Sequence, residues 1–397
     1  MPKNICEINN SGLSRCPLKT AQMSWKETAG WIPIDASEVS ARAQLILVFG
    51  GRAPNVVSRA IQQLHARFPD AAILGCSTAG EIQDIHVTDE GIVATVIEFV
   101  STRVRSATIE LRAGESQRVG EQLAQLLNAP DLRHIVVLSD GLLVNGSDLT
   151  HGIVSSVGKE VTVSGGLAGD GSRFKETFVY TNNGAKGGIV SAVGLYGSAI
   201  RARCASLGGW DSFGPERVVT KSKGNVVFEL DGRSALNLYR EYLGEHATGL
   251  PATGLLFPLS VRGRSDDSGL VRTILGINED EQSITFAGDV PEGQYARLMK
   301  ANFDRLIDGA IAAAKLVTDI AEFHSCDLGI LISCVGRKMV LGQRVEEEVE
   351  GVRDVLGSKP MLTGFYSYGE ISPLTPTAKC ELHNQTMTIT ALKEVVD

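Results

Sequence analysis

The sequence lacks any apolar stretch close to the ~20 residues that a membrane-spanning helix needs. Its longest candidate, residues 187–200, is short and is interrupted by glycines and a tyrosine. The first residues also lack a basic start followed by an apolar block, because Asn4, Glu7 and Asn9 interrupt any such run. We therefore expect neither a membrane span nor a secretion signal, and we predict a cytoplasmic protein.

An excess of positive charge is also missing. The formal net charge is -8, which argues against nucleic acids and anionic membranes as partners. The seven cysteines form no CxxC pair and no regular spacing. In a reducing compartment such cysteines act as small buried side chains, so we do not expect a disulfide scaffold.

Apolar residues and glycine are abundant instead. With 397 residues and 43% hydrophobic content, the chain is large enough for two or three globular domains. Its 43 glycines indicate many tight turns and close backbone approaches.

A repeated pattern organises the sequence. Residues 45–49 predict a buried strand, followed by Gly51-Arg52 and by a helix whose apolar face runs from Val57 to Phe68. A second strand at 71–74 then enters the glycine-punctuated segment Gly75-Cys-Ser-Thr-Ala-Gly-Glu-Ile82.

The same order returns near the C-terminus. A strand at 328–333 precedes Gly336-Arg337, a helix marked by Val345, Val349 and Val352, and the segment Gly364-Phe-Tyr-Ser-Tyr-Gly-Glu-Ile371. A partial third copy comprises a strand at 134–139 and a glycine turn at 164–170 that ends in an acid. This self-similarity predicts repeated strand–helix–strand units.

The pattern predicts an α/β fold with two related domains, whose mixed sheets are built from duplicated strand–helix–strand units. Residues 179–203 and 218–230 favour antiparallel portions, and residues 294–320 predict one long helix. A fresh helix at 234–243 and a core strand at 255–261 follow a boundary near 224–232. We predict three parts, namely an irregular segment 1–24, an N-terminal domain 25–228 and a C-terminal domain 229–397.

Several of these segments resemble a known family. Gly75-Cys-Ser-Thr-Ala-Gly-Glu-Ile82 resembles the signature of the FIST N-terminal domain. The segments at 364–373 and 382–388 resemble the FIST C-terminal domain, and those at 228–235 and 250–258 are similar to further family segments. The resemblance covers the chain from about residue 30 onward.

The resemblance implies a cytoplasmic signal-transduction sensor of a kind common in bacteria, and not an enzyme. Such modules bind a small ligand and act near histidine kinases or cyclic-di-GMP enzymes, and a homo-oligomer is an open alternative. Some members are haem proteins that sense nitric oxide, so haem is the cofactor the resemblance implies here.

A haem iron needs an axial imidazole or thiolate in an apolar pocket. His383, next to an alternating strand, and His246, before an apolar stretch, are the candidate axial ligands, with His383 as the first choice for the iron. Aromatic side chains near the turns and the domain junction are candidates to line a pocket for a planar group. These are Trp210 and Phe213, both expected on a loop, and Tyr366 and Tyr368.

The glycine turns supply the candidate ligand-binding residues Cys76, Ser77, Glu81 and Glu370. One alternative is an enzyme that uses Glu81 and Glu370 as paired acids. A simpler interpretation is that each carboxylate accepts backbone hydrogen bonds and holds its turn in place. A further alternative is a non-haem sensor of amino acids or related metabolites.

Overall fold

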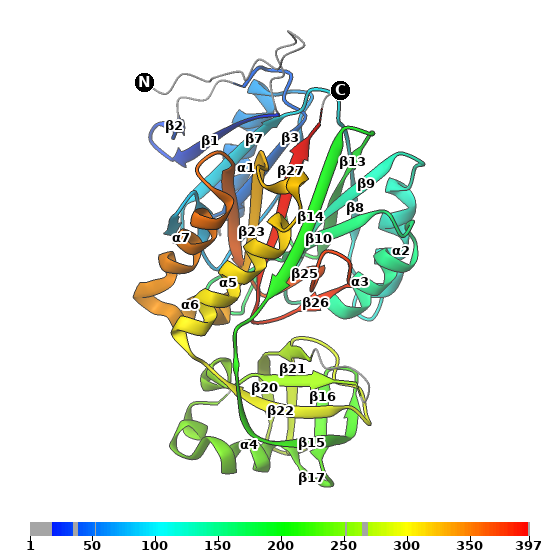
Figure 1. The fold of residues 1–397 in the computed structure, drawn as a ribbon, viewed down its shortest axis with the longest axis vertical. Helices are drawn as coiled ribbons and strands as arrows, with labels where there is room; N and C mark the ends of the chain where they lie inside the picture. The colour runs from blue at the N-terminus through cyan, green and yellow to red at the C-terminus, as the bar shows by residue number, and fades with distance from the viewer. Residues whose placement is uncertain (1–17, 35–38, 52, 251, 264–268, 396–397) are drawn as a thin grey trace.

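The computed structural model describes residues 18–34, 39–51, 53–250, 252–263 and 269–395. These residues form a large body of three similar units and a smaller insert below it (Figure 1). The insert spans residues 211–300 within the third unit, and the end of the final strand lies at the opposite end of the body. No helix in this part of the chain has both the length and the apolar character to span a membrane.

The first unit is a strand–helix–strand segment with flanking antiparallel strands. Its elements are β1 (Lys19–Lys26), β2 (Gly30–Pro33), β3 (Leu45–Gly50), α1 (Pro54–Arg67), β4 (Ala72–Cys76), β5 (Glu81–Gln83), β6 (His86–Thr88) and β7 (Ile92–Glu98). Strands β3 and β4 are parallel, and β7 lies antiparallel to β3. Pro54 begins α1, and the buried residues Val57, Ala60, Ile61 and Leu64 form its apolar face.

The second unit repeats this arrangement. Its elements are β8 (Arg103–Glu110), α2 (Ser116–Leu127), β9 (Leu132–Ser139), α3 (Gly146–Ser155), β10 (Thr162–Leu167), β11 (Val179–Thr181), β12 (Gly184–Lys186) and β13 (Ile189–Tyr196). Strands β9 and β10 are parallel, and β13 is antiparallel to β9. The partial third copy predicted from the sequence is therefore a complete unit.

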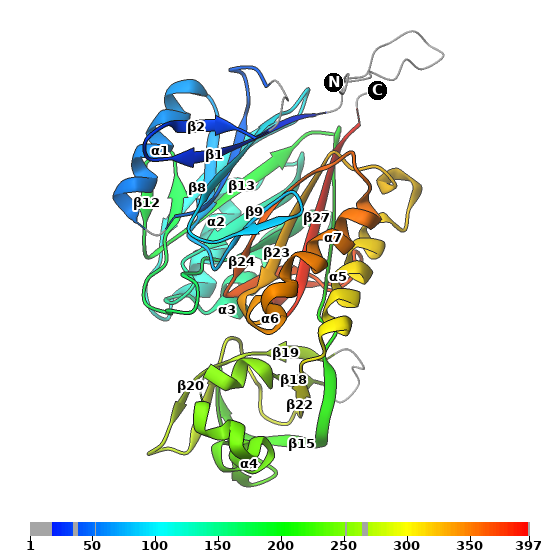
Figure 2. The same cartoon turned by 90° about the vertical axis from the view of Figure 1, so that its left-hand side faces the viewer.

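The third unit has the same plan around the insert. Its elements are β14 (Ile200–Leu207), α5 (Phe303–Thr318), η3 (Ala321–Phe323), β23 (Leu328–Cys334), α6 (Val335–Leu341), η4 (Gly342–Arg344), α7 (Val345–Leu356), β24 (Met361–Ser367), β25 (Gly369–Pro373), β26 (Cys380–His383) and β27 (Met387–Glu394). Strands β23 and β24 are parallel, with β27 antiparallel to β23. In Figure 2, α5 and α7 cover one face of this sheet.

The units exchange strands in a ring. After its parallel pair, each unit sends a strand to the sheet of another unit: β5 pairs with β24, β25 pairs with β10, and β11 pairs with β4. The three mixed sheets that result enclose the apolar core of the body. The exchange gives the body a pseudo-threefold arrangement and brings the three glycine segments to its interior.

One glycine in each unit permits this close strand packing. A Cβ atom at Gly75, Gly165 or Gly364 would lie 2.0, 1.8 or 1.7 Å from a carbonyl oxygen of the adjacent parallel strand. Real Cβ atoms do not come that close, so these positions need glycine. The three glycines occupy equivalent positions, since each pairs with the other strand of its own parallel pair and with the strand received from another unit.

The insert is a separate small β-structure with one helix. Its elements are β15 (Asp211–Lys223), β16 (Val226–Leu230), β17 (Arg233–Ser234), α4 (Ala235–Leu243), η1 (Gly244–Gly249), η2 (Ala252–Leu256), β18 (Leu259–Arg262), β19 (Leu270–Arg272), β20 (Ile274–Asn278), β21 (Ser283–Phe286) and β22 (Tyr295–Lys300). Its sheet is antiparallel throughout.

The predicted mixed α/β fold with duplicated units is confirmed, but three local predictions are wrong. Residues 294–320 are not one helix, because β22 pairs with β15 and β18 before α5 begins at Phe303. Residues 255–261 are not one strand, since η2 runs to Leu256 and β18 begins at Leu259. Residues 19–24 are not irregular, because they pair with β7 as part of β1.

The structure does not test some of the other predictions. Residues 1–17 of the expected irregular segment and Arg52 of the Gly-Arg repeat lie outside the described residues. The division between domains 25–228 and 229–397 stays a prediction, and its boundary falls within β16.

Candidate functional site

Glu81 and Glu370 are buried carboxylates at equivalent positions of the glycine segments 75–82 and 364–371. We call the chain reversal in each of these segments a glycine bend. Glu81 Oε1 accepts a hydrogen bond of 2.6 Å from the Thr78 hydroxyl, and its Oε2 accepts one of 3.0 Å from the Gly91 amide. Glu370 Oε1 accepts from the Ser367 hydroxyl at 2.5 Å, and its Oε2 accepts from the Thr386 hydroxyl at 2.9 Å. Both carboxylates therefore tie their own bends to neighbouring strands.

Asp170 is the third member of this set and has different partners. Its carboxylate accepts backbone hydrogen bonds from Phe174, Lys175 and Glu176 and one from the Tyr368 hydroxyl. It thereby holds the segment after β10 against the bend between β24 and β25.

The pKa values of Glu81 and Glu370 are raised, whereas that of Asp170 is lowered. Burial raises the pKa of Glu81 to about 7 and that of Glu370 to about 8, although hydroxyl and amide donors oppose the shift. Burial also acts to raise the pKa of Asp170, but the Tyr368 hydroxyl and three backbone amides outweigh it, so the pKa of this carboxyl lies below its usual value. The exposed fractions of Glu81 and Glu370 are 1% and 0%, so neither faces solvent.

Cys76 and Ser77 lie at the end of β4 and are buried. Burial raises the pKa of the Cys76 thiol well above its usual range, which disfavours the thiolate needed of a nucleophile. The Ser77 hydroxyl accepts a hydrogen bond of 2.9 Å from the Phe178 amide, and the Ser77 amide donates to the Phe178 carbonyl at 2.9 Å. Ser77 thus extends the pairing of β4 with β11.

The two candidate axial histidines lie in different parts of the molecule. His383 is 2% exposed, and its Nε2 lies 2.8 Å from the Ser372 carbonyl oxygen. Burial lowers the pKa of His383 to about 4, so the ring is neutral and Nε2 donates its proton to that oxygen. His246 is exposed on η1 of the insert, where its ring contacts Phe257 with a centroid distance of 5.5 Å.

These surroundings do not fit an axial haem ligand. Nε2 of His383 is occupied by a backbone carbonyl within a closed strand pair, and His246 has an exposed ring. A haem iron needs a free imidazole nitrogen inside an apolar pocket. Neither histidine is therefore placed to bind a haem iron.

The four candidate aromatic residues do not share one pocket. Trp210 is buried between β14 and β15, and its Nε1 donates to the Gln385 carbonyl at 2.8 Å. Phe213 lies within β15 opposite Leu298, so its predicted loop position is wrong. Tyr366 is fully buried in β24, while Tyr368 stacks on Phe174 at a centroid distance of 4.4 Å.

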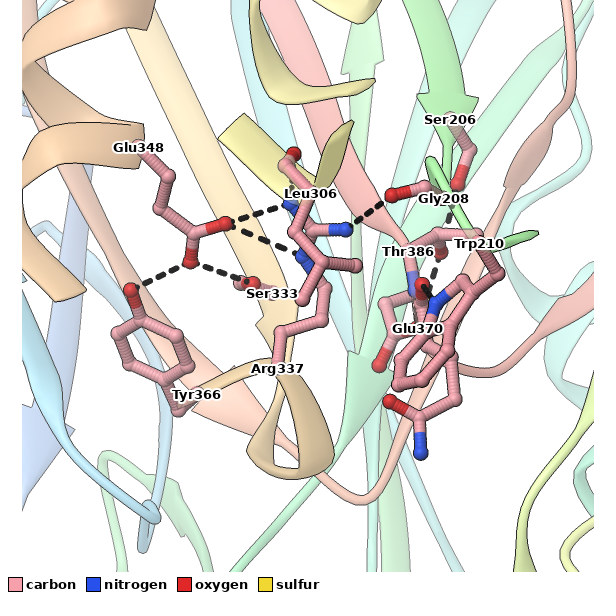
Figure 3. A network of polar contacts seen from close by, with 11 residues as sticks. Ser206, Gly208, Trp210, Leu306, Ser333, Arg337, Glu348, Tyr366, Glu370 and Thr386 are labelled. Atoms are coloured by element: carbon pink, nitrogen blue, oxygen red, sulfur yellow. Dashed lines mark hydrogen bonds and ion pairs between the residues drawn. The ribbon is translucent and has the colours of Figure 1, made fainter. Parts of the chain in front are cut away.

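Tyr366 belongs to a buried polar network that sequence reasoning missed. Glu348 accepts from the Tyr366 hydroxyl at 2.7 Å and from Arg337 Nη2 at 2.6 Å. Figure 3 shows the Arg337 guanidinium between Glu348 and the carbonyl oxygens of Gly208 and Leu306. One signal pointed to this network: Glu348 takes a position on the face of α7 that Val345, Val349 and Val352 otherwise fill.

The structure shows a pocket of about 300 Å³ between the insert and the second and third units. It is lined from the body by α3 and β26 and from the insert by β18, β19 and residues 289–294. Both acidic and basic side chains line it. They are Asp148, Asp289, Glu381, His151, Arg272 and Lys379.

Arg272 is the buried basic group of this pocket, with an exposed fraction of 4%. Its Nε donates to the Asp289 carbonyl at 3.1 Å and its Nη1 to the Leu382 carbonyl at 2.9 Å. Burial lowers the pKa of Arg272 to about 10, so it stays charged at neutral pH. No predicted site residue lines this pocket, and no motif in the sequence marked Arg272 or Asp289.

Comparison with protein families identifies the family of this chain. The FIST N domain model matches residues 44–233, and the FIST C domain model matches residues 235–373. The chain belongs to the FIST family. FIST domains are sensor domains that bind small ligands in signal-transduction proteins.

The curated relatives are distant and only partly covered. An uncharacterized protein of Methanocaldococcus jannaschii is 24% identical over 306 residues, which span 70% of this chain and 57% of that protein. An uncharacterized protein of Mycobacterium tuberculosis is 27% identical over 232 residues, which span 54% of this chain and 56% of that protein. The chain therefore spans less than two thirds of the curated relatives it matches.

A solved structure of cyanuric acid hydrolase, described as structural concatenation, covers 94% of this chain and 98% of its own. The two share 8% identity, and the TM-score is 0.32. At this TM-score the likeness supports no conclusion about function.

Proposed function

We propose that this FIST protein senses a small zwitterionic metabolite, such as an amino acid, in the pocket between insert and body. The observation that carries the proposal is that charged side chains of both signs line a pocket of about 300 Å³. That volume is at the low end of the ~300–1,000 Å³ typical of small-molecule pockets.

The acidic residues of the lining suit an ammonium group. Burial raises the pKa of Asp148, and the nearby charge of Asp289 raises it further. Two carboxylates that repel each other gain when a cation lies between them. A primary ammonium group supplies that cation and has three hydrogen-bond donors.

The basic residues of the lining suit a carboxylate. Nη2 of Arg272 makes no hydrogen bond within the described part of the chain, whereas Nε and Nη1 are used by carbonyl oxygens. Lys379 adds a second positive charge at the pocket wall. Charge-assisted hydrogen bonds from Arg to carboxylates are among the stronger polar contacts in proteins.

Haem and nitric oxide sensing stay a prediction from the family resemblance. The charged lining of the pocket does not suit a porphyrin, and His383 and His246 do not face it. We favour the non-haem sensor, located in the cytoplasm as the sequence predicts. We propose a histidine kinase or a cyclic-di-GMP enzyme as its partner, a choice supported by the family resemblance alone.

We propose no catalytic role for the paired acids. Glu81 and Glu370 are closed off from the pocket, and hydroxyl and amide donors already occupy their oxygens. A general acid or base must reach the proton that it transfers. The simpler interpretation, in which each carboxylate holds its bend, agrees with these contacts.

A thermal-shift screen tests the proposed ligand class. Each of the twenty amino acids and hemin is added separately to the purified protein, and an absorption spectrum is recorded for hemin. A ligand at 100 times its dissociation constant stabilises the fold by about 2.7 kcal/mol, which is readily seen as a raised Tm. We expect at least one amino acid to raise Tm, while hemin gives only the spectrum of free haem. A Soret band from bound haem together with no response to any amino acid would overturn the proposal.

A further inference from the structure

The insert has an apolar core of its own. Its core residues all come from residues 219–298 and include Val219, Tyr239, Leu259 and Phe286. A smaller cluster made of Trp210, Met299, Leu306, Val340 and Leu341 lies where the insert joins the body. A unit with its own core can move as one piece, since its internal contacts do not depend on its neighbour.

Two short connectors join the insert to the body. Residues 208–210 lead from β14 into β15, and residues 301–302 lead from β22 to α5. The connectors are packed closely, because a Cβ atom at Gly209 would lie 1.9 Å from the Arg305 carbonyl oxygen. Gly209 has φ +88°, a conformation that favours glycine. Two adjacent connectors of this kind form a natural hinge.

Arg337 holds both sides of this hinge. Its guanidinium donates to the Gly208 carbonyl before the insert and, at 2.7 Å, to the Leu306 carbonyl after it. Glu348 neutralises the buried charge. In Figure 3 the guanidinium lies between these two carbonyl groups, so the body fixes the connectors themselves.

Polar contacts add to the smaller apolar cluster, against which Leu256 and Val271 of the insert also pack. We call the whole contact between insert and body the seam. Asn145 Nδ2 donates to Asp289 Oδ1 at 3.1 Å, and Arg272 donates to the Leu382 carbonyl. Gln385 Nε2 donates to the Leu255 carbonyl at 3.1 Å. Hydrogen bonds of this kind exchange with water at little net cost, unlike the loss of an apolar core.

Several buried polar atoms at or beside the seam have no partner. Asn384, between the seam residues Leu382 and Gln385, is 0% exposed, and both its Nδ2 and its Oδ1 lack a hydrogen bond among the described residues. The same holds for Gln385 Oε1 and for the hydroxyl of Thr273, next to Arg272. Buried polar atoms without partners are unfavourable, and water or a ligand could pair with them.

We propose that the insert is a hinged lid that opens and closes over the seam pocket about the connectors held by Arg337. The closed state leaves Asn384 unpaired, and opening lets water pair with it. A ligand that bridges the charges of the pocket then favours closure. The ligand part of this proposal rests on the proposed function, whereas the motion does not.

Distances between two spin labels test the motion directly. Gln125 on α2 and Asn237 on α4 are exposed and lie in body and insert, so Gln125→Cys and Asn237→Cys provide the labelling sites. The described native cysteines are buried, and the remaining two are replaced by Cys6→Ser and Cys16→Ser. Pulsed electron paramagnetic resonance then gives the distance distribution without any ligand.

A pair of substitutions opens the lid and closes it again. Asn145→Asp keeps the acceptor that caps α3 but sets a carboxylate against Asp289 in place of a hydrogen bond. We expect this change to raise the open fraction roughly two- to tenfold. Adding Asp289→Asn restores a donor and an acceptor in exchanged positions, so the double variant should return to the wild-type distribution.

Asn384→Leu provides a change in the opposite direction. It replaces the unpaired amide by an apolar side chain of similar size and should lower the open fraction. If this variant does not fold, the Asn145→Asp variant and its combination with Asp289→Asn still test the lid. A single narrow distance that is the same in the wild type and in the Asn145→Asp variant would overturn the lid.

The amino acid that raises Tm most is then added to the labelled wild type. A shift towards the short distance supports ligand-driven closure. A lid that moves but ignores every amino acid contradicts the proposed ligand and leaves the hinge standing. An amino acid that raises Tm without any change in a single narrow distance contradicts the hinge and leaves the sensor standing.

Discussion

Arg337 and Glu348 form an ion pair in which both side chains are 0% exposed. Nη2 and Nε of Arg337 lie 2.6 and 3.1 Å from Glu348 Oε2, while Ser333 and Tyr366 donate to Oε1. The pair joins α6 to α7 and, through Gly208 and Leu306, to the connectors of the insert. Such a pair is stable only because all its hydrogen-bonding groups are matched.

Removing one member of this pair should lower the free energy of unfolding strongly, whereas replacing both members by apolar side chains should lower it much less. Glu348→Leu leaves the Arg337 charge buried without a counterion, so we expect the free energy of unfolding to fall by about 3–5 kcal/mol. The double variant Arg337→Met with Glu348→Leu should recover most of that loss. Urea denaturation of the three proteins measures both effects, and a single variant within about 1 kcal/mol of wild type would contradict this account.

The glycines of the parallel strands should not tolerate a methyl group. Gly165→Ala places Cβ 1.8 Å from the Val137 carbonyl oxygen, so the strands must separate, and we expect a loss of about 3 kcal/mol or more. Gly276→Ala is the matched control, because a Cβ there meets nothing within 4 Å. Equal stabilities of these two variants would argue against the close packing of β9 and β10.

Glu370 should make stability fall as pH rises. Its pKa is about 8 in the folded state and about 4.5 in the unfolded chain, so between these pH values the unfolded state binds fewer protons. This contribution to stability is therefore present below about pH 4.5 and is lost as pH rises towards 8. Glu370→Gln removes the dependence, because it imitates the protonated acid.

The comparison of the two proteins isolates this group from all others. We expect the Glu370→Gln variant to gain about 3–4 kcal/mol on the wild type between pH 5 and pH 8 in urea denaturation. A difference that stays constant over this range would show that Glu370 titrates near its ordinary pKa.

Asp170 should show the opposite dependence. Tyr368→Phe removes one donor to its carboxylate, so the pKa of Asp170 should rise and the fold should lose about 1–2 kcal/mol at pH 7. Because the charged form is the one stabilised, this loss should shrink as pH falls through the folded pKa. Chemical denaturation at pH 7 and at a series of lower pH values checks the trend, and a loss that shrinks at none of them would exclude it.

Local patterns predicted the repeated units well. The two Gly-Glu-Ile bends and the acid Asp170 after a third glycine turn were visible in the sequence, and each lies at an equivalent bend of the body. The exchange of β5, β11 and β25 between units was not predicted, because strand pairing at long range leaves no periodic signal in one segment.

Tertiary context also explains the wrong helix. Residues 295–300 continue the apolar spacing of α5, but β15 and β18 flank them and convert them into a strand. Asn302, whose side chain caps α5 by accepting from the Arg305 amide, was the local sign of the true helix start.

The candidate site was hardest to predict. The motif residues Glu81, Glu370 and Cys76 proved to be buried parts of the scaffold. The pocket is assembled from α3, β26 and the insert, segments far apart in the sequence. Single charged residues such as Arg272 and Asp148 resemble ordinary surface positions until the fold brings them together.

Calorimetric titration is the most direct test of the central claim that the seam pocket binds a zwitterion. The amino acid that raises Tm most is titrated into the wild type, Lys379→Ala and Asp148→Asn, with Arg59→Ala on α1 as a control whose exposed ion pair lies far from the pocket in the sequence. We predict that each pocket variant weakens binding roughly ten- to hundredfold, while Arg59→Ala binds as the wild type does. Equal affinities in all four proteins would contradict the claim and place the ligand elsewhere.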